Sequence, residues 1–394
     1  MIAPEPFFEP RGTPFSEFHR IRALLELGHT VDLVTYPFGQ DVDMPGLRVF
    51  RCLRPPFIRE VRIGPSLSKV ALDATIALTA IRRAASERYD AIHSHEEAGI
   101  LGVLLAAILG LPHLYDMHSS LPQQLTNFEF TRSPLIKRAF EWMERLVVRR
   151  SRVVIVICPQ LADTVRGIDS AVPSVLIENA PGAGDADGAA STEPVRASLG
   201  LGDAPVALYT GTFEAYQGLD LLFNAAAIVA RVRPAVRFVL AGGRPEQIAQ
   251  ARADVEARGL SSQVVFAGQR RADEIPGFLA AADVLLSPRS QGTNTPLKIY
   301  QYLRSGRPIV ATRLLTHTQV LDDDVSFLTE ATADAYAKGI LTALDDPARA
   351  REVGARAKRL ADTKYSYEAY LNRTREAVAY LEGKGVALAA GDAA

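Results

Sequence analysis

Residues 284–312 read VLLSPRSQGTNTPLKIYQYLRSGRPIVAT, and this stretch decides which fold the chain is expected to adopt. An apolar strand is expected at Val284–Ser287, a polar loop with a glycine follows it, and a second apolar strand is expected at Ile309–Ala311. A helix is expected between them from Pro296 to Arg304, because Thr295 is a favourable N-cap residue and proline suits the first helical position. Apolar strands joined by a helix are typical of a parallel sheet covered on both faces. The stretch therefore predicts an α/β protein.

The same alternation of short apolar runs and longer helical runs extends over most of the chain and predicts two doubly wound domains. We expect the first domain at residues 1–180 and the second at residues 198–365. Residues 181–197 have the small, polar composition of a flexible linker, residues 366–382 form a last helix, and residues 383–394 a frayed tail. Other strands are expected at Val31–Thr35, Ala91–Ser94, Val153–Ile157, Val175–Ile177, Val206–Thr210, Arg237–Ala241 and Val264–Ala267. Other helices are expected at Phe15–Leu27, Leu67–Ser86, Pro134–Arg150 and Leu219–Val229.

The first strand is unusually short, because the chain turns at Pro4 directly after Met1–Ala3. Two interpretations remain open. Either the natural start lies a few residues upstream, or these residues form a short edge strand.

Composition limits the class of function and the compartment. Lys and Arg together number 44 and Asp and Glu 45, so no basic excess predicts a general nucleic-acid binder. Two cysteines, Cys52 and Cys158, suit a reducing compartment, and no secretory signal opens the chain. The longest apolar run, Ala98–Leu111, is shorter than the roughly 20 residues that a membrane-spanning helix needs. We expect a soluble, cytoplasmic protein.

Polar residues follow several expected strands, at the sheet edge where doubly wound domains bind ligands. In the first domain His95 and His118 each follow a strand, and Gly12 stands in a turn that feeds a helix. A metal site is possible at the histidines, although strand-end histidines are more often simply hydrogen-bonded. Neither the dinucleotide fingerprint G-x-G-x-x-G nor the P-loop motif G-x-x-x-x-G-K-[ST] is present.

The second domain carries glycine turns after three strands, at Gly211, Gly242-Gly243 and Gly268, and together they outline a nucleotide-sized pocket. The helix after Thr295 has free amides at its start, and Lys298 lies beside them. This combination predicts a diphosphate site, with a solvated surface lysine as the alternative for Lys298.

Several stretches together resemble the retaining glycosyltransferases of family 4. They are LLELGHTVDLVT (24–35), YDAIHSHEEAG (89–99), YDMHSS (115–120), VLIENAPG (175–182), LYTGTFEAYQGLDLLFNAA (208–226), FVLAGG (238–243), VVFAGQ (264–269), ADVLLSP (282–288) and TPLKIYQYLRSGRPIVAT (295–312). The resemblance implies a GT-B fold, in which two Rossmann-like domains face a cleft and the last helix crosses back to the N-terminal domain. It also implies transfer of a sugar from a nucleotide-diphosphate donor to a glycan or lipid-linked acceptor of polysaccharide biosynthesis, with retention and without metal or other cofactor.

Carried over by position, the resemblance makes His118 the catalytic residue and His95 its support. The chain departs from the family pattern in three places. Gln301 stands where a glutamate is usual, and the region of Gln291, Thr293 and Asn294 lacks an acid that is usual there. Thr212 and Gln217 stand where a basic pair is usual. We expect Lys298 and Arg289 to replace that basic pair. The complete set of expected donor-binding residues is Gly12, Gly211, Thr212, Gln217, Gly243, Arg270, Arg289, Asn294, Thr295, Pro296, Leu297, Lys298 and Gln301.

Two other functions remain open because of these departures: a catalytically weak GT-B binding or scaffold subunit, and a nucleotide-sugar epimerase of the same fold. Basic residues are also concentrated between Arg48 and Lys69 and between Arg132 and Arg152. Such clusters are attracted to anionic lipid. They predict peripheral contact with an anionic membrane surface, at the inner face of the cell membrane.

Overall fold

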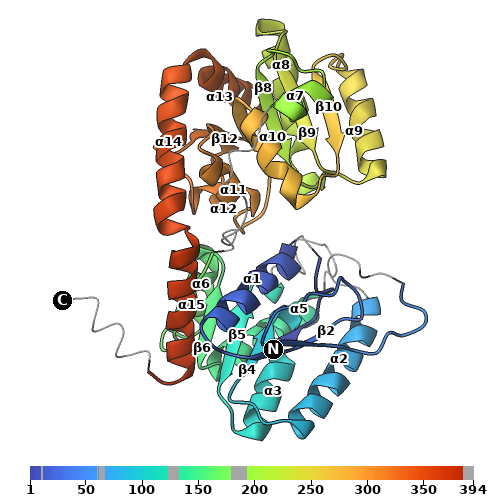
Figure 1. The fold of residues 1–394 in the computed structure, drawn as a ribbon, viewed down its shortest axis with the longest axis vertical. Coiled ribbons are helices and arrows are strands. Elements are labelled where there is room, and N and C mark those ends of the chain that lie inside the picture. The colour runs from blue at the N-terminus through green and yellow to red at the C-terminus, as the bar shows by residue number, and fades with distance from the viewer. Residues whose placement is uncertain (10–11, 60, 62–66, 123–132, 179–192, 385–394) are drawn as a thin grey trace, which may run out of the picture. The chain divides into compact units, whose positions relative to one another are not determined.

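The computed structural model describes residues 1–9, 12–59, 61, 67–122, 133–178 and 193–384. The chain divides into two compact units (Figure 1). Unit 1 contains Met1–Asn179 together with Glu368–Ala394, and unit 2 contains Ala180–Tyr367. The expected linker at 181–197 lies outside the described residues except for its last part, where the helix α7 (Glu193–Ser198) begins. The predicted linker is therefore wrong at 193–197.

Unit 1 is built on a seven-stranded parallel sheet in the order β3-β2-β1-β4-β5-β6-β7. Its strands are β1 (Ile2–Ala3), β2 (Val31–Thr35), β3 (Leu47–Arg51), β4 (Ile92–His95), β5 (His113–Met117), β6 (Val153–Val156) and β7 (Ser174–Leu176). Its helices are α1 (Gly12–Glu26), α2 (Leu67–Ser86), α3 (Gly99–Leu109), α5 (Pro134–Arg150), α6 (Pro159–Ile168) and α15 (Tyr367–Leu381). The strand order reverses between β1 and β4, so the ligand-binding crevice of this topology lies beyond the carboxyl ends of these two strands.

The strand β1 lies inside the sheet, although only two residues long. Ile2 pairs with Val34 of β2 on one side and with Ser94 of β4 on the other. The interpretation of β1 as an edge strand is therefore wrong. Its position places the residues after Ala3 at the centre of the ligand-binding edge.

Unit 2 is built on a six-stranded parallel sheet in the order β10-β9-β8-β11-β12-β13. Its strands are β8 (Val206–Thr210), β9 (Arg237–Ala241), β10 (Val264–Gly268), β11 (Val284–Ser287), β12 (Ile309–Thr312) and β13 (Phe327–Thr329). Its other helices are α8 (Leu219–Val232), α9 (Pro245–Ala257), α10 (Ile275–Ala281), α11 (Lys298–Ser305), α12 (Leu315–Thr318), α13 (Ala333–Asp345) and α14 (Pro347–Lys364). The order reverses between β8 and β11, which places the crevice of unit 2 beyond these strands.

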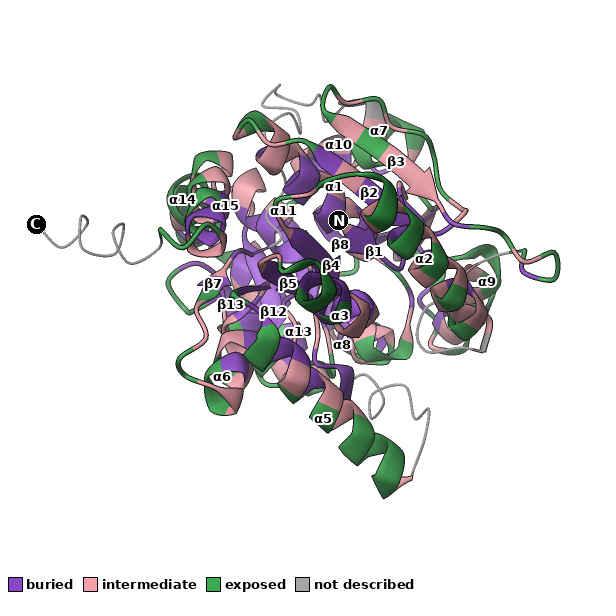
Figure 2. Cartoon of the chain, turned by 90° about the horizontal axis from the view of Figure 1, so that it is seen from below, coloured by how far each residue is buried: buried purple, intermediate pink, exposed green. Residues whose placement is uncertain are grey.

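Both faces of the unit 2 sheet are covered, as the apolar strands predict. In β8, Ala207 and Tyr209 pack into one hydrophobic cluster, whereas Val206 and Leu208 pack into another. Since successive side chains of a strand point to opposite faces, the two clusters are the two sides of one sheet. Figure 2 shows the buried strands inside their half-exposed helices. The alternation confirms the doubly wound fold.

The last helix, α15, packs against unit 1. The Arg20 guanidinium of α1 donates a hydrogen bond to Oγ1 of Thr374 at 3.2 Å and lies 5.0 Å from the centroid of the Tyr370 ring. Arg373 forms an ion pair with Glu178, close after β7. These contacts explain why residues from 368 onward belong to unit 1 although they follow unit 2 in the sequence.

Candidate active site

The two histidines predicted from the sequence meet at the carboxyl edge of the unit 1 sheet. His95 is the last residue of β4 and His118 follows β5 directly. Nδ1 of His95 lies 3.3 Å from Nε2 of His118, and both side chains are buried. Neighbouring parallel strands bring them together, as their positions at two strand ends predict.

Asp116 organises this pair, and the sequence prediction missed it. Its Oδ1 lies 3.2 Å from Nε2 of His118, and its Oδ2 accepts a hydrogen bond from Nε of Arg20 at 2.9 Å. Burial would raise the pKa of Asp116, but Arg20 and His118 hold it well below its usual range. The available signal was the spacing in YDMHSS, because Asp116 lies two residues before His118 and such residues share one side of an extended strand.

The two histidines differ in charge. Burial lowers the pKa of His95 well below its usual value, so its imidazole is neutral near pH 7. Burial acts in the same direction on His118, but the Asp116 carboxylate outweighs it and leaves the pKa of His118 raised. Of the two, His118 is therefore the one whose protonated form is favoured, and in that form it can donate a hydrogen bond to an oxygen that gains negative charge.

A metal site is the alternative that the sequence left open for these histidines. Ligand atoms of His93, His95 and Asp116 lie within 4.8 Å of one another, and all three side chains are buried. Arg20, however, already donates to the Asp116 carboxylate, so a metal ion would face a buried guanidinium. The arrangement therefore favours an ion pair, and we retain the expectation of a metal-independent site.

Three buried acids, which the sequence prediction also missed, lie at the same edge. Glu5 follows β1, Glu96 follows β4, and Glu17 belongs to α1. Burial raises the pKa of Glu17 to about 8 and that of Glu96 to about 7, and it raises the pKa of Glu5 well above its usual value. Only the HSHEE run after β4 gave a signal in the sequence, since Glu5 and Glu17 come from segments that meet only in the fold. Gly12, predicted near the donor, is the first residue of α1.

In unit 2 the donor-site prediction centres on Lys298, which the structure places in the crevice between β8 and β11. Nζ of Lys298 donates a hydrogen bond to the Thr210 carbonyl at 3.1 Å and lies 3.9 Å from the centroid of the Tyr209 ring. A Cβ on Gly211 would lie 3.6 Å from the same Nζ. Lys298 is 9% exposed, so its interpretation as a solvated surface lysine is wrong.

The positive charge of this crevice has no acidic counterpart. Burial, with a contribution from Arg289, lowers the pKa of Lys298 well below its usual value. Burial likewise lowers the pKa of Arg289. Among the described residues no carboxylate forms an ion pair with either side chain. A lysine and an arginine without a carboxylate partner form a site suited to an anion, because a bound anion favours the charged form of Lys298.

Arg289 also shapes the loop that precedes Lys298. Its Nε donates to the Gln291 carbonyl at 2.8 Å, and its Nη1 to the Asn294 carbonyl at 3.2 Å. Gly292 has φ +110°, and a Cβ there would lie 2.7 Å from Nη2 of Arg289. Only glycine therefore fits where the loop wraps the guanidinium.

Three side chains from β12 and the α12 region hold the same loop from the other side, and the sequence analysis did not predict these contacts. Each donates a hydrogen bond to a loop carbonyl at 2.6 Å. Thr312 reaches Arg289, Thr316 reaches Asn294, and Gln319 reaches Thr293. With its carbonyls fixed in this way, the loop has a defined backbone next to the two cations.

The helix expected from Pro296 begins two residues later, at Lys298, and Leu297 occupies the N-cap position. The predicted cap is therefore wrong: Thr295 precedes the helix start, and its buried Oγ1 has no hydrogen-bond partner among the residues that the structure describes. Pro296 is buried and Leu297 half-buried before the helix, and Gln301 is half-buried one turn into it. The later start makes Lys298 the first residue of the helix.

The remaining donor residues divide into two groups. Nε2 of Gln217 donates to Oγ1 of Thr212 at 3.4 Å, and their turn contacts the Arg289 loop, since the Ser290 amide donates to the Tyr216 carbonyl at 3.1 Å. Gly243 and Arg270 have structural contacts instead. A Cβ on Gly243 would lie 2.7 Å from the Phe213 ring. Arg270 is exposed, pairs with Glu274 at 3.4 Å and lies over Phe278. The structure therefore does not support Arg270 as a donor ligand.

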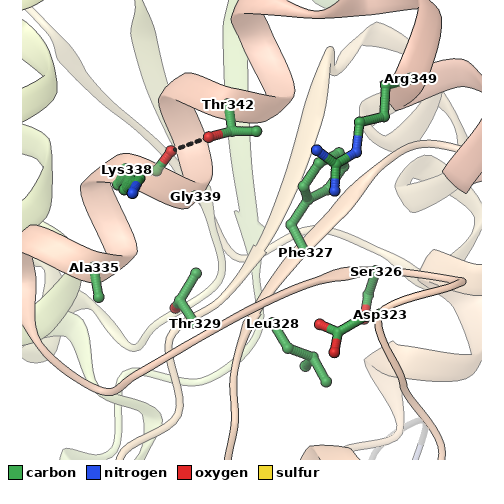
Figure 3. Close-up of a pocket in the computed structure, with 10 residues that line it drawn as sticks. All are labelled: Asp323, Ser326, Phe327, Leu328, Thr329, Ala335, Lys338, Gly339, Thr342 and Arg349. Carbon is green, nitrogen blue, oxygen red and sulfur yellow. Dashed lines mark hydrogen bonds between the residues drawn. The ribbon is translucent and has the colours of Figure 1, made fainter.

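Two surface cavities of unit 2 contain none of the predicted residues. One, of about 350 Å³, lies between β13 and α13 (Figure 3), where Arg349 lies 5.5 Å from the Phe327 ring centroid and Lys338 faces the same space. The other, of about 200 Å³, lies beside α8 and α9. The donor site is thus identified by its charge and its position at the sheet reversal.

Two protein families match the chain in succession. Residues 19–180 match the "Glycosyl transferase 4-like domain" and residues 204–346 the "Glycosyl transferases group 1". The alpha-D-kanosaminyltransferase of Streptomyces kanamyceticus is 30% identical over 300 residues, which are 71% of this chain and 74% of the relative. The 2-deoxystreptamine N-acetyl-D-glucosaminyltransferase of Streptomyces fradiae is 30% identical over 284 residues, 68% of this chain and 65% of the relative. The D-inositol 3-phosphate glycosyltransferase of Kineococcus radiotolerans is 27% identical over 340 residues, 77% of this chain and 76% of the relative.

Solved structures share the fold over the whole chain. The sucrose-phosphate synthase of Thermosynechococcus elongatus superposes with a TM-score of 0.78 at 21% identity, over 97% of this chain and 99% of that protein. HepE of Anabaena, in complex with UDP-glucose, superposes with a TM-score of 0.70 at 16% identity, over 96% of this chain and 99% of that protein. At 21% and 16% sequence identity, these similarities show a shared fold.

Proposed function

The chain belongs to the glycosyltransferases with the GT-B fold, and we propose that unit 2 binds the diphosphate of its nucleotide-sugar donor between Lys298 and Arg289. The observation that carries this proposal is the buried Lys298 beside the half-buried Arg289, neither of which has a carboxylate partner among the described residues, at the carboxyl edge where the sheet order reverses. A diphosphate supplies the missing negative charge, and the amides at the start of α11 add donors for its oxygens.

The reaction that we propose retains the configuration at the anomeric carbon. The bond from this carbon to the diphosphate oxygen breaks, a bond to the acceptor oxygen forms on the same face, and the departing diphosphate takes the acceptor proton. The support is the family resemblance together with the charge of the crevice, because Lys298 and Arg289 stabilise the diphosphate as it gains charge. No residue of the chain is needed as a nucleophile.

His118 is the residue we assign to the transferred sugar. Its raised pKa favours the protonated form, which can donate a hydrogen bond to a sugar or diphosphate oxygen. Asp116 maintains this protonation and the orientation of the ring, and His95 lies against the same nitrogen. We therefore treat His118 as the catalytic residue, with His95 and Asp116 as positioning residues.

Purified protein tests the proposal directly. UDP-, GDP-, ADP- and dTDP-sugars are compared by thermal shift, since a ligand at 100 times its Kd stabilises the fold by about 2.7 kcal/mol. We expect one nucleotide class to raise the Tm and to release its nucleoside diphosphate on incubation. A flat response to all four classes contradicts the donor site.

We also propose that α5 binds an anionic membrane surface. Residues Pro134–Ala139 of this helix are all exposed (Figure 2), Leu135 is 74% and Trp142 63% exposed, and Lys137, Arg138 and Arg145 form no ion pair within the described part of the chain. Apolar and basic side chains exposed on one helix suit an interface with acidic lipid. Over the described residues, no helix is both long and apolar enough to span a bilayer.

The other basic stretch does not support this membrane proposal. Arg48 pairs with Asp32 at 2.6 Å, Arg51 with Asp41 at 3.1 Å and Lys69 with Glu97 at 3.3 Å. Arg62 lies outside the described residues. Three cations of this stretch therefore contribute little to lipid binding, and we restrict the proposal to α5.

The chain contains a single tryptophan, Trp142, which reports on α5 directly. We expect its fluorescence to shift to the blue with vesicles rich in phosphatidylglycerol and to stay unchanged with phosphatidylcholine vesicles. Replacing Lys137 and Arg138 by Glu should abolish the shift, whereas the same change at Arg231 and Arg233 of unit 2 should preserve it. Equal spectra with both lipids rule out the membrane surface as the partner of α5.

A further inference from the structure

Three carboxyl groups at the ligand-binding edge of unit 1 have no role in the chemistry assigned to His118. Glu5, Glu17 and Glu96 come from three separate segments and are 9%, 0% and 8% exposed. They interact electrostatically with one another or with His118, so they surround the catalytic residue rather than lying apart from it. Burial raises the pKa of all three acids, because a buried carboxylate without a cation is costly, and a bound cation would favour their ionised form.

The cations of unit 1 are already engaged elsewhere. Arg20 pairs with Asp116, and Lys69 pairs with Glu97 at 3.3 Å. Nε2 of His118 lies 3.2 Å from Oδ1 of Asp116. The amino group of Met1 donates a hydrogen bond to the Asp32 carbonyl at 2.8 Å. In the part of unit 1 that the structure describes, no basic side chain forms an ion pair with Glu5 or Glu17, whereas Glu96 accepts hydrogen bonds from the Ser119 hydroxyl.

Hydrogen bonding at this edge is also incomplete. Glu5 and Glu17 are hydrogen-bonded to one another. Apart from that contact, neither oxygen of Glu17 has a partner among the described residues, and the same holds for Oε1 of Glu5 and Nε2 of the fully buried His95. Beyond the hydrogen bond that Glu5 and Glu17 share, these oxygens have capacity to accept that no described residue uses, which points to a ligand that brings N–H donors and positive charge.

We propose that the acceptor of this glycosyltransferase carries ammonium groups, as an amino sugar or aminocyclitol does, and that Glu17 and Glu5 bind an ammonium group while Glu96 adds negative charge. This inference rests on the proposed function, because it assigns the acceptor of the same reaction. Bound in this way, the ammonium group holds the ring at the edge where His118 lies, so a neighbouring hydroxyl is presented for transfer.

The names of the relatives define the alternatives. Two of them name 2-deoxystreptamine, an aminocyclitol, whereas others name D-inositol 3-phosphate, a cyclitol of similar size and opposite charge. A phosphate would meet three carboxyl groups and no counter-charge at this edge, because Arg20 and Lys69 already pair with Asp116 and Glu97. The residues of this chain therefore favour the cationic ring over the anionic one.

Binding of an ammonium group has a further measurable consequence. Glu17, whose pKa burial raises to about 8, faces Glu5, Asp116, His118 and the Met1 amino group, and it holds a proton near pH 7 in the empty site. A cation beside the carboxyl group favours its ionised form, so the proton is released when the ligand binds. The measured heat of binding then depends on the ionisation enthalpy of the buffer.

The experiment compares three cyclitols by titration calorimetry: 2-deoxystreptamine, myo-inositol and D-inositol 3-phosphate. We expect the diamine to bind at least roughly tenfold more tightly than myo-inositol, since charge-assisted hydrogen bonds are the stronger ones. We expect the inositol phosphate to bind most weakly. Titrations in phosphate and Tris buffers at pH 7 should differ in heat for the diamine and agree for myo-inositol.

Substitutions identify the residues responsible. Glu17→Gln and Glu5→Gln should weaken diamine binding roughly 10- to 100-fold, because each removes one charge-assisted partner at constant shape. Glu144→Gln is the matched control: Glu144 is a buried acid of α5 that accepts a hydrogen bond from the Leu121 amide, so its loss should leave diamine binding unchanged. A Tm within the range of the parent shows that each variant is folded.

Three results overturn the inference: undetectable diamine binding at millimolar concentration, equal binding of the diamine and myo-inositol, or unchanged diamine binding in both Glu17→Gln and Glu5→Gln. Nucleoside diphosphate binding is measured on the same samples. If it is absent while the diamine still binds in a Glu17-dependent way, the donor-site proposal fails and the acceptor assignment stands. If it is present while the diamine fails, only the acceptor assignment is lost.

Discussion

Asp116 is the residue on which unit 1 depends most, because it is the counter-charge of two buried cations, Arg20 and His118. Asp116→Asn leaves Arg20 without a counter-charge, and breaking a buried pair in this way costs about 3–5 kcal/mol. It also removes the influence that raises the pKa of His118, so that pKa should fall. Urea unfolding measures the first effect and an NMR titration of His118 the second.

The control for this prediction is an exposed pair in the same unit. Arg166 and Asp163 lie 2.6 Å apart on α6, and both side chains are more than half exposed. Asp163→Asn should therefore leave the unfolding midpoint unchanged, since solvent screens such pairs. Equal stability of Asp116→Asn and the parent would show that Arg20 does not need its partner.

Glu17 predicts a pH dependence of stability. Its pKa is about 8 in the folded chain against 4.5 ordinarily, so between these values the folded state holds a proton that the unfolded state releases. The stabilising contribution is complete below pH 4.5 and is lost as pH rises toward 8, at up to about 1.4 kcal/mol per pH unit. Glu17→Gln should show a smaller decline, to which only the other buried acids, such as Glu5 and Glu96, still contribute. Urea unfolding of both proteins at pH 5, 6, 7 and 8 checks it, and parallel curves contradict the buried proton.

Lys298 predicts selectivity for the diphosphate over the nucleoside. A charge-assisted hydrogen bond contributes about 1.5–3 kcal/mol, so Lys298→Ala should weaken nucleoside diphosphate binding roughly 10- to 150-fold. The bare nucleoside, which carries no phosphate, should bind almost as tightly as before. Calorimetry with both ligands provides the comparison. If Lys298→Ala and Arg289→Ala both bind the diphosphate as the parent does, the phosphates are held elsewhere.

At the scale of elements, the loop between β11 and α11 depends on one glycine. Gly292 has φ +110°, and an alanine there is strained and would also meet the Arg289 guanidinium at 2.7 Å. Gly292→Ala should destabilise unit 2 by about 1–3 kcal/mol and also weaken diphosphate binding, because Arg289 must move. Gly259 has φ +67° with open space around its Cβ position. Gly259→Ala should therefore affect the Tm alone, and an unchanged diphosphate affinity in Gly292→Ala would separate the loop from the donor site.

At the scale of the whole molecule, unit 1 is discontinuous in sequence whereas unit 2 is not. The helix α15 buries Tyr370, Thr374 and Ala377 against unit 1, and Thr374 accepts a hydrogen bond from Arg20. A chain that ends at Tyr367 should therefore lose amide protection in unit 1 and keep it in unit 2. Hydrogen exchange resolved by peptide distinguishes the two, and equal loss in both units would show that they unfold together.

The sequence by itself determined the fold class, since apolar strands that alternate with helices have few arrangements other than parallel sheets covered on both faces. It also located His95, His118, Arg289 and Lys298, because these residues follow strands or begin a helix, and the carboxyl edge of such sheets is where ligands bind. These signals are local: each can be read within a few residues of a strand end.

Only the tertiary structure decided the environment of those residues. Arg20 reaches Asp116 from 96 positions away and Thr374 from 354, and Glu5, Glu17 and Glu96 meet from three separate elements. The burial of Lys298, which rules out a surface lysine, likewise depends on β8 and its Tyr209 ring. Charge and pKa depend on which groups lie within a few ångströms and on the exclusion of water. The residues next to a site residue in the sequence determine neither its charge nor its pKa. The sequence could therefore identify the site residues, whereas their chemistry depends on the tertiary structure.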